Sequence, residues 1–84
     1  METDIRICLR EAEEARAFVE AAEHFKCDID LICGRYIVNA KSMLGVLSLV
    51  SGEVMTVCIR SEDPDEISAF DSAMRPFAAG SMQD

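Results

Sequence analysis

The side chains of this 84-residue chain that could do chemistry are few, and they include one histidine and four cysteines. His24 lacks an evident partner, so no Ser/His/Asp or Cys/His nucleophile set can be recovered. No C-x-x-C pair occurs among the cysteines, which are Cys8, Cys27, Cys33 and Cys58. We interpret them as reduced, small apolar side chains. The sequence therefore predicts no metal site and no cofactor, and a conventional enzyme is not expected.

Two helix starts contain the remaining candidate residues. Ser42 stands directly before the apolar run 43–49, where its hydroxyl can accept hydrogen bonds from the first free amides of a helix. Glu11, Glu13 and Glu14 crowd the first turn of another predicted helix, where carboxylates interact favourably with the helix dipole. Ser42 has a purely structural explanation as a helix cap, which is worth about 1 kcal/mol. The three glutamates have one as a solvated helix start.

The elements that position these residues follow from the hydrophobic periodicity. Alternation of apolar and polar residues predicts strands over 3–9, 28–31, 36–39 and 53–60. Apolar residues at three- and four-residue steps predict helices over 11–25 and from Pro64 onward. The run 43–49, apolar nearly all round and preceded by Ser42, predicts a short helix, although the run alone fits a buried strand equally well.

The third helix has the clearest boundaries. Asp63 can cap it, Pro64 suits its first position and Glu66 can reach back toward the cap. Pro76 is expected to bend or end it and Gly80 to close it.

The resulting order is βαββαβα, without a linker, repeat or low-complexity segment. The economical architecture is an α+β fold in which a four-stranded, mainly antiparallel sheet has three helices on one face. We predict a single domain over residues 1–84.

Charge and hydropathy exclude several classes of partner. Sixteen acidic residues against eight basic ones give a formal net charge of −8, which would repel nucleic acid and anionic membranes. No apolar run approaches the length of a membrane helix, roughly 18 residues. The first four residues have neither the basic start nor the apolar stretch of a secretory signal, so a cytoplasmic location is expected.

The element order, together with the segment Val38–Leu49, resembles the histidine-containing phosphocarrier family (HPr) of the bacterial sugar phosphotransferase system. The resemblance runs over nearly the whole chain. Its most specific part is Lys41-Ser42 followed by the apolar pair Met43-Leu44 and then by Gly45-Val46. It implies the open-faced β-sandwich of that family.

The family's catalytic histidine lies in a pattern like G-x-H-x-R-P at the start of the first helix. Counting back from Ser42 without gaps places Glu11 at the histidine, Glu13 at the arginine and Glu14 at the proline. Phosphotransfer by that motif needs a neutral imidazole, a guanidinium and free amides. Two carboxylates there would repel a phosphoryl group by a few kcal/mol per close pair at an effective dielectric near about 20. The sequence therefore assigns no catalytic residue.

The resemblance also implies a regulatory role for Ser42. In Gram-positive relatives, a serine kinase phosphorylates the corresponding serine and a transcriptional regulator recognises it. The partners it implies are such proteins, or other members of the phosphotransferase system. The implied docking surface consists of Lys41, Met43, Leu44 and Leu47. We expect Met43 to be its exposed contact, and some of Leu44, Val46 and Leu47 to be buried.

The main hypothesis is thus a regulatory, protein-binding module that lacks the phosphorylatable histidine. One alternative is a phosphocarrier with a non-standard acceptor, such as an acyl phosphate on Glu11. His24 is an unsuitable substitute, because it falls roughly 20 Å along the helix from its start. The other alternative is a structural interaction domain that self-associates through the second helix.

Overall fold

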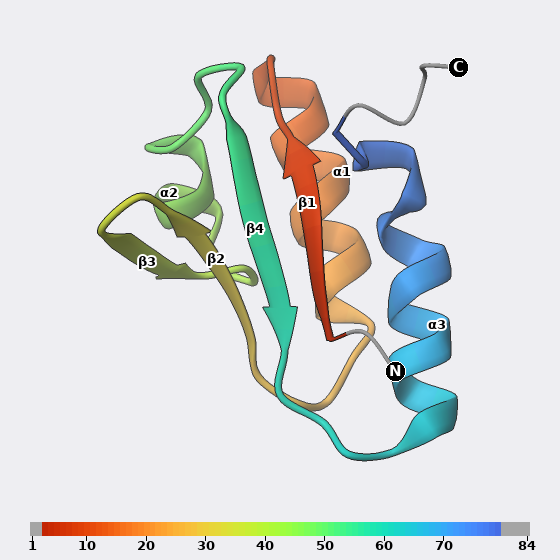
Figure 1. Cartoon of the computed structure of the whole chain (residues 1–84). Coiled ribbons are helices and arrows are strands. Elements are labelled where there is room, and N and C mark those ends of the chain that lie inside the picture. The colour runs from red at the N-terminus through yellow and green to blue at the C-terminus, as the bar shows by residue number, and fades with distance from the viewer. Residues whose placement is uncertain (1–2, 80–84) are drawn as a thin grey trace.

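A four-stranded sheet in which every pairing is antiparallel forms one layer of the protein, and three helices cover one of its faces (Figure 1). The computed structural model describes residues 3–79. Its elements are β1 (Asp4–Cys8), α1 (Ala12–Glu23), β2 (Ile29–Cys33), β3 (Tyr36–Asn39), α2 (Met43–Leu47), β4 (Val54–Ile59), α3 (Pro64–Met74) and the 3₁₀ helix η1 (Arg75–Phe77). The strand order is β1-β4-β2-β3. The predicted α+β class and element order are confirmed.

The core lies between the sheet and the helices. Val57 at the centre pairs with Ile5 on one side and with Leu31 on the other, and these residues point to the covered face. From the helices, Phe18 meets Phe77 edge to face at 5.6 Å, and Phe25 meets Phe70 at 6.0 Å. The first contact joins α1 to η1, and the second joins the segment after α1 to α3.

Two helices end earlier than their apolar patterns predict. At the end of α1, the amide of Phe25 bonds to the Ala22 carbonyl, three residues back. At the end of α2, the amide of Leu49 bonds in the same way to Val46. The final turns are therefore tightened to the 3₁₀ pattern, so the apolar periodicity outlasts the α-helical hydrogen bonds.

The start of α3 confirms the predicted cap but corrects one of its contacts. The Asp63 carboxylate accepts a hydrogen bond from the Asp65 amide at 3.0 Å. The Glu66 carboxylate, expected to reach toward the cap, instead accepts from the Ser61 hydroxyl at 2.8 Å, and that hydroxyl oxygen accepts from the Asp63 amide. The Ser61 hydroxyl thus links the Glu66 carboxylate to the Asp63 amide. The α-helix ends at Met74, and Pro76, which has no amide to continue its hydrogen bonds, lies inside η1. Gly80 lies outside the described residues.

Replacement of Asp63 by alanine should lower the free energy of unfolding by about 1 kcal/mol, because the Asp65 amide loses its acceptor. Urea denaturation followed by circular dichroism measures the loss. Ser68→Ala, at an exposed position inside the same helix, is the control and should change stability by less than about 0.5 kcal/mol. Equal losses of stability in the two variants would show that the cap hydrogen bond makes no specific contribution to the free energy of unfolding.

Candidate functional site at two helix starts

The start of α1 is exposed and acidic. Glu11 is the N-cap residue, with extended backbone angles of φ −137° and ψ 161°, and its side chain makes no capping hydrogen bond. Glu11 and Glu13 are both exposed to solvent. The Glu14 carboxylate accepts a hydrogen bond from the Arg10 amide at 2.6 Å. The position that the sequence aligns with a catalytic histidine is thus a helix start that bears three carboxylates.

The loop between α2 and β4 holds this helix start in place. The Gly52 amide donates to the Leu9 carbonyl at 3.1 Å, and the Cys8 thiol donates to the Gly52 carbonyl at 3.0 Å. Gly52 has φ +81°, a left-handed conformation that favours glycine. Figure 1 shows the loop before β4 and the start of α1 at the same end of the sheet. Cys8 is buried at this junction, although the alternation of β1 places it opposite the core residues.

Ser42 is the N-cap of α2, as predicted. Its hydroxyl oxygen accepts a hydrogen bond from the Gly45 amide at 3.3 Å, and the residue is exposed. A Cβ on Gly45 would lie 3.2 Å from Cβ of Val38 and 3.4 Å from the Ser42 hydroxyl. The glycine therefore lets α2 approach β3 closely while the cap is kept.

Lys41 does not extend freely beside Ser42. Its ammonium group donates to the Phe25 carbonyl at 2.5 Å, and its amide donates to the Asn39 side chain at 2.8 Å. The lysine thus connects the segment before α2 with the segment after α1. A docking role for Lys41 remains a prediction, and the contact observed is structural.

The exposed face of α2 differs from the expectation in one residue. Leu44 is 83% exposed and Leu47 is 38% exposed, whereas Val46 is fully buried. Met43, which was expected to be the exposed contact, is half-buried against the core, so that expectation is wrong. Residues three apart share a helix face, and Met43 falls on the face of Val46 while Leu44 falls on that of Leu47.

His24 lies at the opposite end of α1 from Glu11. It is the exposed C-cap residue, and its ring nitrogen Nδ1 is 2.9 Å from the Glu20 carbonyl. The structure therefore does not bring the histidine to the start of α1.

The four cysteines are free thiols. Burial, with a smaller contribution from the neighbouring Asp4 carboxylate, raises the pKa of Cys58 to about 11. Burial and the Glu66 carboxylate likewise raise the pKa of Cys27. A higher pKa leaves less thiolate, which is the reactive form. Across residues 3–79 no three His, Cys, Asp or Glu side chains are grouped so that they could hold a metal ion.

Cys58 should therefore alkylate slowly with iodoacetamide at about pH 9, on the order of 50-fold more slowly than in the urea-unfolded chain. The rate should climb as the pH approaches about 11, where the folded thiol ionises. Because the unfolded thiol ionises first, the neutral Cys58 favours the folded state below about pH 9, and this contribution disappears between about pH 9 and 11. Mass spectrometry of the peptide that contains Cys58 measures the rate, and equal folded and unfolded rates would contradict the prediction.

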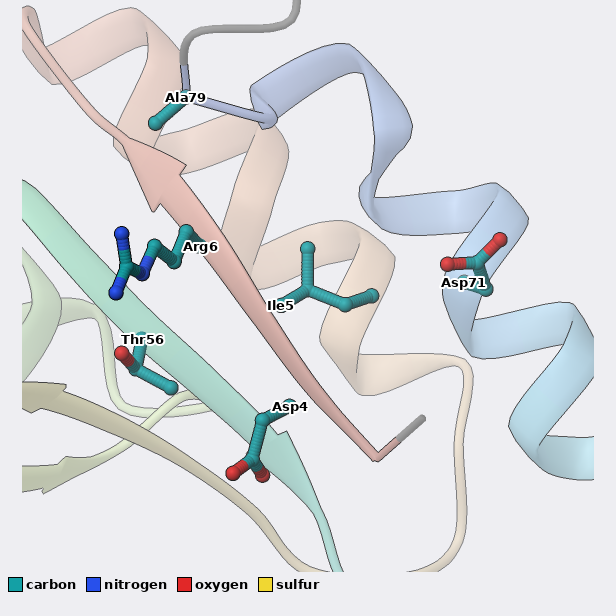
Figure 2. A pocket seen from close by; sticks show the side chains of 6 residues that line it. All are labelled: Asp4, Ile5, Arg6, Thr56, Asp71 and Ala79. Carbon is teal, nitrogen blue, oxygen red and sulfur yellow. The ribbon is translucent and has the colours of Figure 1, made fainter. Parts of the chain in front are cut away.

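A depression along β1 is lined by other residues, namely Asp4, Ile5, Arg6, Thr56, Asp71 and Ala79 (Figure 2). Its side chains lie on both sides of the strand, with Arg6 and Thr56 on one side and Ile5 and Asp71 on the other. None of the candidate residues from the sequence lines it, so it adds no chemistry to either helix start.

Comparison with known proteins decides the family. The model of the family described as the PTS HPr component phosphorylation site matches residues 10–78. The chain belongs to the HPr family. The phosphocarrier protein HPr of Treponema pallidum is 35% identical over 66 residues, which are 79% of this chain and 75% of that protein.

Solved structures of the HPr family superpose on this chain. HPr-C-His from Thermoanaerobacter tengcongensis gives a TM-score of 0.72 at 26% identity, covering 92% of this chain and 91% of that one. HPr from Bacillus anthracis gives a TM-score of 0.66 at 27% identity, covering 83% of this chain and 89% of that one. The Bacillus subtilis catabolite repression protein Crh, described as a swapped and intertwined dimer, gives 0.61 at 32% identity, covering 87% and 83%.

These comparisons confirm the resemblance that the sequence predicts, and with it the HPr fold. HPr proteins are phosphocarriers of the sugar phosphotransferase system that interact with other proteins of that system. Within residues 3–79 of this HPr-family chain, no helix has the length and apolarity needed to cross a membrane.

Proposed function

We propose that this HPr-family protein is a regulatory, protein-binding module that works through Ser42 and the exposed face of α2, and that it does not carry phosphoryl groups on histidine. The observation that carries the proposal is the start of α1, where Glu11 and Glu13 stand at the positions that the sequence aligns with the family's histidine and arginine. The module is a single domain over residues 1–84, acts in the cytoplasm and has no enzymatic activity or cofactor of its own.

The chemistry of the α1 start supports this proposal. A phosphohistidine carrier needs a neutral imidazole as nucleophile and a positive charge close to the phosphoryl oxygens. Glu11 and Glu13 supply negative charge, and the single histidine of the chain lies at the far end of the helix. A phosphoryl group transferred to this helix start would be repelled by its carboxylates.

The α2 surface supports the regulatory half of the proposal. Ser42 is exposed, and Leu44 and Leu47 place apolar surface on the same short helix. A phosphate on Ser42 would add a charge of about −2 to this surface. A partner that packs on Leu44 would bind differently before and after modification. The proposed docking residues are Lys41, Met43, Leu44 and Leu47, and the proposed partners are a serine kinase and a transcriptional regulator, or phosphotransferase-system proteins.

An HPr-type serine kinase with labelled ATP should phosphorylate the protein on Ser42, and Ser42→Ala should abolish essentially all of the label, because the cap serine is the exposed hydroxyl in the matching segment. Ser48→Ala is the matched control, since Ser48 is exposed at the other end of the same helix. Autoradiography with peptide mapping measures the result. Label retained in Ser42→Ala would contradict the regulatory role.

Incubation with phosphoenolpyruvate and the general phosphotransferase, Enzyme I, tests the other half of the proposal. The protein should remain unlabelled. A stable adduct would contradict the proposal, and its hydrolysis would identify the acceptor, because acyl phosphate, phosphohistidine and phosphoserine differ in acid and base stability. A hydroxylamine-sensitive adduct lost in Glu11→Gln would establish the acyl-phosphate alternative.

A further inference from the structure

The two edges of the sheet differ in how they are covered. The outer edge of β1 pairs with the end of the chain, because Ile7 bridges Ala78 and the Arg6 carbonyl accepts from the Ala79 amide at 3.0 Å. Asp4 and Arg6 also place charges along that strand. The opposite edge is β3, which has β2 as its one strand partner within residues 3–79 (Figure 1).

The backbone of β3 presents hydrogen-bonding groups outward. The Ala40 amide donates to the Ile29 carbonyl at 2.8 Å, which marks these residues as a hydrogen-bonded pair. Pairing alternates along an antiparallel ladder, so Val38 bonds to β2 while Ile37 and Asn39 turn their amides and carbonyls away from it. The free edge therefore offers the donor and the acceptor of Ile37 to another strand.

The side chains of β3 do nothing to block such pairing. Natural edge strands are usually protected by being very short, as β3 is, or by lysine, proline, a bulge or a covering segment. The segment Tyr36–Asn39 contains neither lysine nor proline, and Tyr36 and Ile37 are 63% and 64% exposed. The strand combines open hydrogen-bonding groups with exposed apolar side chains.

The charge distribution indicates what can cover this edge. All sixteen acidic residues lie outside residues 31–52, which contain Arg35 and Lys41 as their charged side chains. The carboxylate of Asp30, opposite Asn39 in the sheet, is paired with Arg60 at 2.7 Å. Two copies of a chain with net charge −8 can thus meet at β3 without opposing unpaired carboxylates from residues 31–52, whereas the β1 edge carries the Asp4 carboxylate.

We propose that β3 is a self-association edge, at which a second copy of the chain adds its own β3 in antiparallel orientation about a two-fold axis. Ile37 of each copy then packs near the axis, and its amide and carbonyl pair across the interface. The strand is short, so the dimer is weak and forms with rising concentration. This inference is independent of the proposed role of Ser42.

Sedimentation equilibrium on the full chain, from micromolar to millimolar concentration, should show a monomer–dimer equilibrium that strengthens with salt, because salt screens the net charge. Ile37→Lys should raise the dissociation constant by at least roughly tenfold. Val54→Lys and Leu44→Lys are matched controls, because each makes the same charge change at an exposed apolar residue of β4 or α2. Each control should stay within roughly twofold of the wild type.

Amide hydrogen exchange gives a second measurement on the wild type, which keeps the test valid if a variant fails to fold. Exchange of the Ile37 amide should slow as concentration rises, while the Val38 amide, already bonded to β2, should not change. A monomer at all concentrations in high salt, a dimer that persists in Ile37→Lys, or one abolished by Leu44→Lys would overturn the proposal. Labelling of Ser42 is read separately, so the failure of either proposal is distinguishable from failure of the other.

Discussion

The double substitution Glu11→His and Glu13→Arg should produce a protein that accepts a phosphoryl group from phosphoenolpyruvate through Enzyme I, whereas we expect the wild type to stay unlabelled. The helix start is already available, because Glu11 is an exposed N-cap residue whose side chain makes no capping hydrogen bond. The substitution supplies the imidazole nucleophile and a guanidinium. It also removes carboxylate repulsion of a few kcal/mol per close pair. We expect labelling to rise by at least roughly 100-fold over background.

A matched variant tests whether position, and not composition, produces this gain. Glu20→His with Glu23→Arg makes the same residue changes on exposed positions near the other end of α1. It should remain unlabelled, and Glu11→His alone should be labelled less than the double variant, because it lacks the guanidinium. Transfer of labelled phosphate is measured, and the adduct should be labile in acid and stable in base, as phosphohistidine is. An unlabelled double variant would show that the scaffold itself is incompetent for transfer.

Phe18→Ala should destabilise the protein by about 3–5 kcal/mol, because it removes a fully buried ring from the centre of α1 and leaves a cavity. The ring also meets Phe77 edge to face, so the contact between α1 and η1 is lost with it. A domain of this size has a net stability of roughly 3–5 kcal/mol, so the variant should be largely unfolded at room temperature.

Urea unfolding followed by circular dichroism measures this loss. Phe18→Leu is the control, since it retains most of the apolar volume and should cost less than about half as much. A loss below about 1 kcal/mol in Phe18→Ala would mean that the core collapses around the missing ring. In that case the position of the α1 start would not depend on this packing.

Local sequence patterns were sufficient for the elements of the fold. The alternation in β1 and β4, the cap at Asp63 and the serine at Ser42 each act within a few residues, and the structure contains each of them. The helix ends were less predictable. The hydrogen bonds of α1 and α2 tighten to three-residue spacing while their apolar periodicity continues.

The sequence was sufficient to predict which residues stand at the candidate site, but not which other side chains and backbone groups they contact. Counting from Ser42 identified Glu11 as the acidic helix start, and the structure places it at the N-cap of α1. The contact of the Lys41 ammonium with the Phe25 carbonyl had no sequence signal, because the two residues are sixteen positions apart and meet through packing of the segments around α1 and α2.

The sequence by itself determined the order of the elements, the HPr resemblance, and the acidic residues at the start of the first helix, because each depends on residue type and short spacing. Tertiary structure alone decided which leucines of α2 face solvent, why Cys8 is buried, and which sheet edge is open. These features depend on contacts between distant segments, such as Gly52 with Leu9 and Ala79 with Arg6. A periodic pattern distinguishes two faces of an element, but the segments packed against it determine which of them is covered.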